Sequence, residues 1–486
     1  MKMTVRSIIE AAGAQIVSGD VSHLSRTVTH VITDTRILPS DPDIKHAAFL
    51  ALKGETFDGN TFAPAAAALG VGLVICERFE PDGSAVCTDT VAAVCEDTLR
   101  AYGRIAAAHR RLYKGTVIGI TGSVGKTTTK EFVYGAVSSV GSASKTKANF
   151  NNDIGVPKTV LDIGDEKTAV VEMGMRGRGQ IEYLVDIVRP DIAIVTNIGF
   201  AHIELLGTIE NTLRAKLEIA SRMDEKGILI LNGDDGLLAD RANVLGILNE
   251  AYGARPEIFY YGSGQNARVM AQNVEAEDGF TAFDLRIDGR FIRHVTMSMR
   301  GRHNVYAALA AISAVYAMTG SVKTVEDSVI PAVSVLTGEA FGRQKTLDAG
   351  GVTVIDDCYN AGPESVKAQL ESLAMRRPAD GHKRVAVLGD MIELGDEAER
   401  LHREVASKAV ELGIDRLICV GRLSSNMDAG CFRAAPGKRS EFFYFDDSEA
   451  CAREIVSLTE PGDVVLVKGS HGMHMEKVTE ALIDRG

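Results

Sequence analysis

Short apolar runs alternate with amphipathic stretches along most of this chain. In the middle of the sequence, four such runs are each followed by a segment with helical periodicity, and they lie at 116–120, 169–172, 192–197 and 227–232. The last third repeats the alternation, with apolar runs at 352–355, 384–388, 416–420 and 463–467. Strands that alternate with helices are typical of parallel α/β sheets. The pattern therefore predicts two such sheets in succession.

On this pattern the chain divides into three regions. Residues 1–110 hold short predicted strands and helices rich in small residues. Residues 111–338 contain the first sheet, a polar β-like stretch at 269–299 and an Ala-rich helix at 304–318. Residues 339–486 have the pattern of a smaller doubly wound domain. Because 486 residues are too many for one hydrophobic core, we expect an α/β protein with three domains.

The composition excludes several classes of protein. A net charge of −12 argues against nucleic acid as the main partner, because a phosphate backbone demands a basic surface. The seven cysteines are scattered and form no C-x-x-C pair, which fits a reducing cytoplasm and neither a disulfide framework nor a zinc site. The N-terminus lacks an apolar signal segment, and no apolar run reaches about 18 residues. We therefore expect a cytoplasmic protein without membrane insertion.

The most informative motif follows the first apolar run of the middle region. It is Gly122-Ser123-Val124-Gly125-Lys126-Thr127-Thr128-Thr129, and a helix is predicted after it at 130–140. A strand, a Gly-rich turn and a helix start form a phosphate cradle, in which Lys126 would contact the β- and γ-phosphates and Thr127 would coordinate Mg²⁺. Ile120 stands where the general pattern has Gly. A turn before an ordinary helix explains Gly-Lys-Thr less well, so the motif predicts binding of a nucleoside triphosphate.

Polar residues also stand at the carboxyl ends of later predicted strands, where open α/β sheets bind ligands. Glu172 ends one strand, and His202 follows the strand that Asn197 ends. With Thr127, Glu172 and His202 would form a sparse magnesium site, which suffices because Mg²⁺ takes few protein ligands and adds phosphate oxygens. The simpler alternatives are a strand-end charge in solvent for Glu172 and a loop or helix-capping residue for His202. The phosphate loop nearby favours the metal site.

Lys216 allows two interpretations. Between 208 and 223, apolar residues recur at helical spacing, and Lys216 borders the face that they form. A lysine there either extends its amine to water or loses its charge. Periodicity alone favours an amine that reaches water.

These motifs and others along nearly the whole chain resemble those of the Mur ligase family. The first region has Asp34-Thr35-Arg36, 49–54 (FLALKG) and Phe57-Asp58-Gly59. The middle region adds 149–157 (NFNNDIGVP), Glu172-Met173-Gly174, 196–199 (TNIG) with Ala201-His202, and 301–304 (GRHN), and the last region adds 356–361 (DDCYNA), 389–395 (GDMIELG) and Lys468-Gly469-Ser470. The blocks NNDIGVP and GDMxELG resemble the branch that adds D-alanyl-D-alanine. Two features depart from the family pattern: His471 stands where relatives often have Arg, and the segment 39–45 is longer than usual.

The resemblance implies three roles for three α/β domains. The N-terminal domain would bind the UDP end of one substrate, a P-loop ATPase-like central domain with a mostly parallel sheet would bind ATP, and a Rossmann-like C-terminal domain would close over ATP and bind the incoming dipeptide. In this family the lysine matching Lys216 is carbamylated and helps to hold a second Mg²⁺, so the resemblance overrides the interpretation from periodicity.

The resemblance also implies the site residues. For ATP they are Gly122, Ser123, Val124, Gly125, Lys126, Thr127, Thr128, Asn304, Arg343 and Asp357. For two Mg²⁺ ions they are Thr127, Glu172, His202 and Lys216, and the catalytic set is Lys126, Glu172, His202 and Lys216. For the other substrates they are Thr35, Arg36, Lys53, Asp58, Asn151, Asn152, Tyr359 and Asn360.

The implied activity is that of an ATP-dependent ligase of class 6.3.2 in peptidoglycan precursor synthesis. It would join D-alanyl-D-alanine to UDP-N-acetylmuramoyl-tripeptide through an acyl phosphate, and we expect a monomer. One alternative is a sibling ligase that adds a single amino acid, but the Asp-Asn-Pro-Arg motif of the ligase that adds the third residue is absent after Met391. Another alternative is a nucleotide-dependent switch, which would not need Glu172, His202 and Lys216 together.

Overall fold

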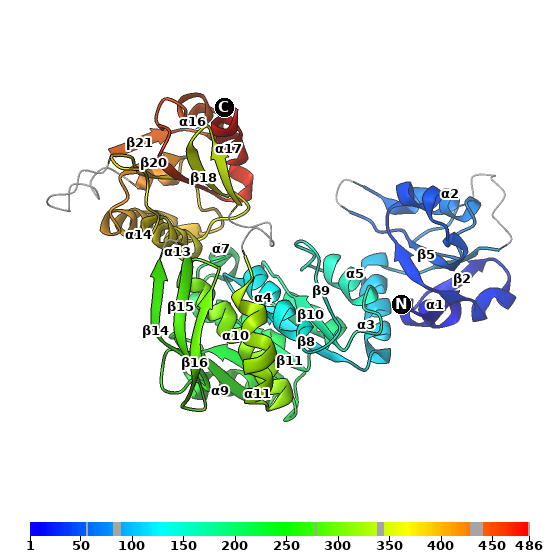
Figure 1. Ribbon diagram of the computed structural model, residues 1–486. Coiled ribbons are helices and arrows are strands. Elements are labelled where there is room, and N and C mark those ends of the chain that lie inside the picture. The colour runs from blue at the N-terminus through cyan, green and yellow to red at the C-terminus, as the bar shows by residue number, and fades with distance from the viewer. Residues whose placement is uncertain (55–56, 81–88, 278, 338–344, 428–440, 485–486) are drawn as a thin grey trace.

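The computed structural model describes residues 1–486 except 55–56, 81–88, 278, 338–344, 428–440 and 485–486. Three lobes follow one another along the chain, each built on its own sheet (Figure 1). The expected α/β architecture with three domains is confirmed. Among the described residues, no helix has the length and apolar character needed to cross a membrane.

The N-terminal domain has a five-stranded sheet in the order β2-β7-β6-β5-β4. The sheet is parallel except for β2. Its strands are β2 (Gln15–Ser18), β4 (His30–Ile32), β5 (Ala47–Leu50), β6 (Leu73–Cys76) and β7 (Val91–Val94), with β1 (Met3–Thr4) and β3 (Thr27–Val28) paired separately. The helices are α1 (Val5–Ala12) and α2 (Ala63–Ala68). The long helix α3 (Thr98–Leu112) then leads into the central domain.

The central domain has a nine-stranded sheet in the order β16-β15-β14-β13-β12-β11-β8-β10-β9. The strands are β8 (Thr116–Thr121), β9 (Ala143–Lys145), β10 (Thr168–Glu172), β11 (Ile192–Val195), β12 (Ile228–Asn232), β13 (Glu257–Gly262), β14 (Val269–Glu277), β15 (Phe280–Ile287) and β16 (Arg290–Met297). The first seven are parallel, and β14, β15 and β16 form an antiparallel meander. This meander is the polar β-like stretch predicted at 269–299.

Helices cover both faces of the central sheet. They are α4 (Lys126–Ser138), α5 (Gly155–Leu161), α6 (Gln180–Val188), α7 (Ile203–Leu206), α8 (Ile209–Leu217), α9 (Arg241–Tyr252), α10 (His303–Thr319), α11 (Val322–Thr324) and α12 (Ile330–Ser334). On β8, Val117 belongs to the core that includes α3, α5 and α6, whereas Ile118 belongs to the core that includes α4 and α10. Burial on both faces explains why these strands are apolar runs without alternation.

The C-terminal domain has a six-stranded sheet in the order β17-β18-β22-β19-β20-β21, antiparallel only at β17. The strands are β17 (Lys345–Ala349), β18 (Val352–Asp357), β19 (Arg384–Gly389), β20 (Arg416–Val420), β21 (Glu441–Phe445) and β22 (Val464–Lys468). The helices are α13 (Pro363–Ala374), α14 (Ala398–Glu411), α16 (Ser448–Glu454) and α17 (Glu476–Ile483). The doubly wound pattern predicted the four inner strands, but not the edge strands β17 and β21.

The helix after the phosphate motif differs from its prediction. It runs from Lys126 to Ser138 instead of 130–140, because Gly125, with φ of 81°, ends the loop and starts the helix. Lys126 and the three threonines after it therefore lie in the first turns of α4. The strand β8 lies between β10 and β11, so the chain leaves β8 at a point where the strand order reverses. Such a point is where open α/β sheets bind ligands.

Candidate active site

A cavity of about 1570 Å³ lies between the central and C-terminal domains. A pocket for one small ligand usually has about 300–1,000 Å³, so this cavity has room for more than one ligand. Its walls include many of the residues predicted from the sequence: Ser123, Val124, Gly125, Lys126, Thr127, Thr128, Asn151, Asn152, Glu172, His202, Asn304, Asp357, Tyr359 and Asn360. Segments from two domains thus bring together residues far apart in the sequence.

The phosphate loop is held rigidly against the neighbouring strand. The side chain of Asn197 accepts a hydrogen bond from the Val124 backbone N–H at 2.9 Å, and Thr196 Oγ1 donates to the Val124 carbonyl at 2.6 Å. Gly122 has φ of 148°, and an added Cβ would lie 1.9 Å from Thr196 Oγ1, so only glycine fits there. The Lys126 ammonium lies over the loop and donates to the Gly122 carbonyl at 2.8 Å. The loop therefore has its cradle shape and its cation in place before a ligand arrives.

Glu172 ends β10 and is 1% exposed. One carboxylate oxygen, Oε1, accepts a hydrogen bond from Asn151 Nδ2 at 2.8 Å. The other, Oε2, is buried without a hydrogen-bond donor in the part of the chain that the structure describes, and the Lys130 ammonium lies 3.6 Å from it. A buried oxygen that lacks a donor is costly unless something else binds it. The structure thus rejects the alternative of a strand-end charge in solvent.

His202 begins α7 and forms an ion pair across the domain boundary. Its Nδ1 contacts the carboxylate of Glu393, which the C-terminal domain supplies. Burial lowers the pKa of His202, and the negative charge of Glu393 opposes this shift. The other ring nitrogen, Nε2, has no hydrogen-bond partner among the described residues. Nε2 is therefore the nitrogen of His202 available to a ligand.

Lys216 is 1% exposed, so the prediction from periodicity that its amine reaches water is wrong. Periodicity placed Lys216 at the border of the apolar face, and tertiary packing covers that border. Burial lowers the pKa of Lys216 well below its usual value, and the nearby charge of Lys126 adds to the shift. Lys216 lies outside the cavity lining, and it makes no ion pair or hydrogen bond with any other described residue through its amine. Burial thus favours the neutral form of this amine, while the charge of Glu218 opposes the shift.

The C-terminal wall is built from polar groups that pair with one another. The Lys468 ammonium donates to Asp357 Oδ2 at 2.6 Å and to the carbonyl of Asn360 at 2.7 Å. Tyr359 accepts a hydrogen bond from the central domain through Asn149 Nδ2 at 2.8 Å. The ring of His471 lies edge-on to that of Tyr359 at 6.2 Å. Asp357 and Tyr359 thus face the phosphate loop across the cavity while they are already anchored.

A magnesium ion fits this donor set. Thr127, Glu172 and His202 all line the cavity, and Oε2 of Glu172, which accepts no hydrogen bond among the described residues, is the kind of hard oxygen ligand that Mg²⁺ prefers. No group of three or more His, Cys, Asp or Glu side chains in the described ranges could hold a metal by itself. Such a site would need phosphate oxygens to complete the coordination, as is usual for Mg²⁺ beside nucleotides.

The remaining predicted residues lie elsewhere. Thr35, Arg36, Lys53 and Asp58 belong to the N-terminal domain and are not part of the cavity lining. There Arg36 pairs with Asp34 at 2.6 Å, and Asp58 pairs with Arg78 at 2.6 Å. Gly122 is not part of the cavity lining. Arg343 falls in a segment outside the described residues.

Sequence reasoning missed two charged residues of the site. Lys130 is the ammonium beside Glu172, and it also lies 3.4 Å from Glu131. The sequence offered one indication of this role. Lys130 lies four residues after Lys126, and residues with this spacing lie on the same side of a helix. Glu393 lies within the GDMIELG block, but nothing in the sequence pairs it with His202.

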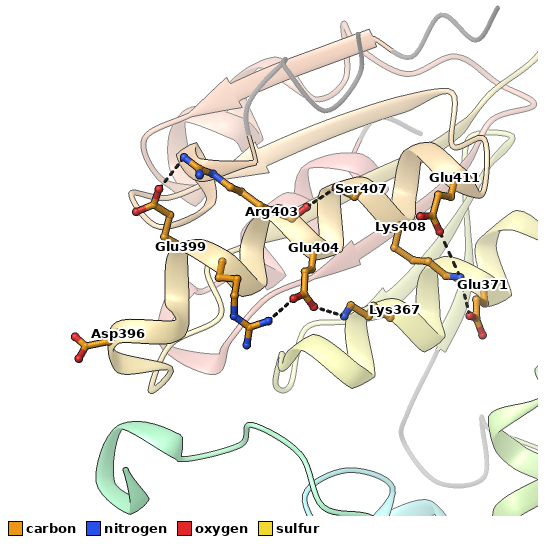
Figure 2. Close-up of a pocket in the computed structure, with 10 residues that line it drawn as sticks. Lys367, Glu371, Asp396, Glu399, Arg403, Glu404, Ser407, Lys408 and Glu411 are labelled. Atoms are coloured by element: carbon orange, nitrogen blue, oxygen red, sulfur yellow. Dashed lines mark hydrogen bonds and ion pairs between the residues drawn. The ribbon is translucent and has the colours of Figure 1, made fainter. Parts of the chain in front are cut away.

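A second hollow, of about 830 Å³, lies on the surface between α13 and α14 (Figure 2). Its charged side chains neutralise one another: Lys367 pairs with Glu404 at 2.9 Å, Arg403 with Glu399 at 2.7 Å and Lys408 with Glu371 at 3.5 Å. Paired surface charges leave no strong attraction for a ligand. The cavity at the phosphate loop is therefore the better candidate.

Comparisons with known proteins agree with this site. Residues 120–315 match the family model of the Mur ligase middle domain, and residues 342–471 match that of the Mur ligase glutamate ligase domain. The UDP-N-acetylmuramoyl-tripeptide–D-alanyl-D-alanine ligase of Bacillus subtilis (strain 168) is 33% identical, and the match covers 100% of this chain and 99% of the relative.

Two solved structures are similar over nearly the whole fold. A crystal structure of MurF from Acinetobacter baumannii has a TM-score of 0.84 at 28% identity and covers 100% of this chain and 99% of its own. The MurF ligase from Thermotoga maritima, in complex with ADP, has a TM-score of 0.76 at 25% identity and covers 94% of this chain and 98% of its own. The resemblance seen in the sequence motifs is thus confirmed, and the chain belongs to the Mur ligase family, in the branch that adds D-alanyl-D-alanine.

Proposed function

We propose that this protein is an ATP-dependent ligase that joins D-alanyl-D-alanine to UDP-N-acetylmuramoyl-tripeptide in peptidoglycan precursor synthesis. The observation that carries the proposal is the preformed phosphate loop facing a cavity large enough for several ligands, in a chain that aligns over its full length with ligases of this name.

The chemistry needs activation of a carboxylate, which is a poor acylating agent. The terminal carboxylate oxygen of the tripeptide attacks the γ-phosphorus of ATP, and ADP leaves with the electrons of the broken P–O bond. The amine of D-alanyl-D-alanine then attacks the carbonyl carbon of the acyl phosphate. Loss of a proton from the nitrogen and departure of phosphate give the amide. Because several anionic groups meet in the first step, positive groups that are already in position would lower its barrier most.

The ATP site would use the phosphate loop. The residues are Gly122, Ser123, Val124, Gly125, Lys126, Thr127 and Thr128, with Asn304, Arg343 and Asp357 contacting the rest of the nucleotide. The backbone N–H groups at the start of α4 and the Lys126 ammonium would bind the phosphates, since the loop is already held open by Asn197 and Thr196. The ADP bound to the Thermotoga maritima relative supports this part of the proposal.

Two magnesium ions would be held by Thr127, Glu172, His202 and Lys216. When bound, they would neutralise charge that develops on the transferred phosphoryl group. Oε2 of Glu172 and Nε2 of His202 support these assignments, since neither makes a hydrogen bond within the described part of the chain. Lys216 would act as a carbamate, formed when its neutral amine adds to CO₂ and loses a proton. The lowered pKa of Lys216 supports this, because only a neutral amine is a nucleophile.

The other substrates would span the three domains, taken as 1–110, 111–338 and 339–486. Thr35, Arg36, Lys53 and Asp58 would bind the UDP end on the N-terminal domain, and Asn151, Asn152, Tyr359 and Asn360 would bind the peptide parts. Asn151 and Tyr359 support this by lining the cavity from opposite domains. A monomer in the cytoplasm is the state we propose, since the five described cysteines are buried and free, as in a reducing compartment.

The test is phosphate release from ATP by the purified protein, with UDP-N-acetylmuramoyl-tripeptide and D-alanyl-D-alanine supplied singly and together. We expect release only with both, and a product heavier by one dipeptide unit in mass spectrometry. Release that ignores the dipeptide would contradict the proposal and favour a nucleotide-dependent switch. Replacement of the dipeptide by single amino acids would test the sibling ligases.

Carbamylation of Lys216 has a separate test. Protein equilibrated with ¹³C-bicarbonate is expected to give a carbamate signal in ¹³C NMR that Lys216→Arg abolishes. Arginine is the control because it keeps the positive charge but cannot form this carbamate. A signal that persists in Lys216→Arg would contradict the assignment.

A further inference from the structure

Three arginines line one part of the cavity, away from the phosphate loop. Arg100 lies in the first turn of α3, and Arg176 and Arg178 lie in the segment between β10 and α6. In Figure 1, α3 stands between the N-terminal sheet and the central sheet. The three residues are called the arginine wall here, and α3 places Arg100 on the side of the cavity toward the N-terminal domain.

The charges of the arginine wall are only weakly compensated, by the longer-range attraction between Arg178 and Glu218. None of the three guanidinium groups forms an ion pair within the described part of the chain, and all three side chains are exposed to solvent. The acidic side chains nearby form no ion pair with these arginines in the part of the chain that the structure describes. Glu218 accepts hydrogen bonds from the backbone at Gly179 and Glu182, and Asp153 also lines the cavity.

Part of the wall is also held in position. The Arg100 guanidinium lies over the ring of Tyr183 at 4.5 Å, and α3 packs against α6, which carries Tyr183. Stacking on an aromatic ring orders the planar guanidinium while its N–H groups stay available. A fixed guanidinium binds a carboxylate through two parallel hydrogen bonds, which a lysine ammonium cannot do. In a protein with a net charge of −12, three unpaired arginines in one cavity indicate an anionic ligand.

We propose that Arg100, Arg176 and Arg178 bind the free carboxylates of the acceptor peptide and so select its third residue. This inference rests on the proposed function. A peptide attached to UDP on the N-terminal domain must pass α3 and α6 to bring its reactive carboxylate to the phosphate loop. The wall then faces the side chain of the third residue. A side chain ending in a carboxylate, as in diaminopimelate, is bound, whereas the lone ammonium of lysine is repelled.

The test compares two acceptors that differ only in the third residue, diaminopimelate or lysine. Calorimetry measures binding of each to the full-length protein without ATP, and phosphate release with ATP and D-alanyl-D-alanine gives kcat/KM for each. We expect the wild type to favour the diaminopimelate acceptor by about tenfold or more, as one charge-assisted pair predicts. Equal affinity and equal kcat/KM for the two acceptors would overturn the inference.

Variants of the three arginines test whether the arginine wall causes the preference for the diaminopimelate acceptor. Arg100→Gln, Arg176→Gln and Arg178→Gln are each expected to bring the ratio of the two kcat/KM values toward one, mainly through the KM of the diaminopimelate acceptor. The matched control is Arg293→Gln on β16, which removes one exposed, unpaired arginine far from the cavity lining. A ratio that all three variants leave unchanged would overturn the inference. If neither acceptor is ligated although both bind, the proposed function fails, and the calorimetric preference still decides whether the wall selects carboxylates.

Discussion

The central and C-terminal domains face the same cavity with the carboxyl ends of parallel strands, but their polar groups differ in state. On the central side, Oε2 of Glu172 is buried without a hydrogen-bond donor in the described ranges, although the Lys130 ammonium lies 3.6 Å from it, and the Lys216 side chain is buried outside the cavity lining. On the C-terminal side, Asp357 pairs with Lys468, and Asp390 accepts a hydrogen bond from the Ser424 N–H at 2.6 Å. The named C-terminal carboxylates have partners, although Oε2 of Glu364, which also lines the cavity, is buried without a hydrogen-bond donor among the described residues.

The difference separates two uses of buried polar groups. A buried group without a partner destabilises the ligand-free fold and becomes favourable only when a ligand binds it. A buried pair keeps its shape whether or not a ligand is present. In the proposed function the central domain would carry the chemistry, and the C-terminal domain would supply a preformed surface that closes over ATP. Substitutions on the central side should therefore mainly lower activity. Substitutions on the C-terminal side should mainly lower stability.

The largest expected effect is on activity and comes from the central wall. Lys126→Ala removes the cation of the phosphate loop, and we expect turnover to fall by about 10³-fold, as for the loss of other groups that stabilise developing charge. The thermal unfolding midpoint should hardly change, since Lys126 is only partly buried. Phosphate release and a melting curve measure the two. Lys114→Ala, on the exposed segment before β8, is the control, and a Lys126→Ala variant with substantial ligase activity would refute the phosphate-loop assignment.

The next effect is on stability and comes from the C-terminal wall. Lys468→Met leaves the Asp357 carboxylate buried without its cation, and we expect the C-terminal domain to lose about 3 kcal/mol of unfolding free energy. The double variant with Asp357→Leu removes both charges and should recover most of that loss. Urea unfolding followed by hydrogen exchange in β18 and β22 measures it. A double variant as unstable as Lys468→Met would show that packing, and not the unpaired charge, causes the loss.

The same comparison explains what the sequence could predict. The phosphate loop, the inner strands and Glu172 at a strand end depend on local patterns, so they were predictable. The burial of Lys216 was not, because periodicity places a residue on a helix face but does not say what packs against the border of that face. The contact between His202 and Glu393 is tertiary, and so is the presence of Arg100 and Arg178 in one cavity lining. No spacing in the sequence predicts either of them. The edge strands β17 and β21 lack the double burial that makes inner strands continuous apolar runs.

A substitution at Lys216 in the central domain should have a smaller effect on stability, and it should raise the unfolding free energy instead of lowering it. Lys216→Met replaces a buried amine that makes no hydrogen bond among the described residues with an apolar side chain of similar size, so the unfolding free energy should rise by about 2 kcal/mol, the typical cost of burying such a polar group. Ligase activity should be lost in the same variant. Urea unfolding of both proteins under CO₂-free conditions measures the difference. A destabilised Lys216→Met would mean that the amine has a favourable interaction in the folded state.

The smallest effect is a pH dependence that arises inside the C-terminal domain, at His402 in α14. His402 is fully buried: its Nδ1 donates to the Ala398 carbonyl at 2.7 Å, and its Nε2 accepts from the Met391 N–H at 3.1 Å. Burial lowers the pKa of His402 below its usual 6.5, so the unfolded chain takes up a proton first as the pH falls. Stability is therefore full above about pH 6.5 and declines below it, by at most about 1.4 kcal/mol for this one residue between pH 7.5 and 5.5.

His402→Gln isolates the contribution of that histidine. The glutamine amide can donate to Ala398 and accept from Met391 but does not titrate, so the variant should lose less stability than the wild type over the same pH range. Urea midpoints of the C-terminal domain at pH 7.5 and 5.5 give the comparison. An identical pH dependence in both proteins would show that His402 does not cause the loss of stability at low pH. His109 would then be the candidate, because it is buried in α3 and burial lowers its pKa as well. In that case the acid sensitivity would belong to the junction between the N-terminal and central domains, and the C-terminal wall would keep its paired structure at low pH.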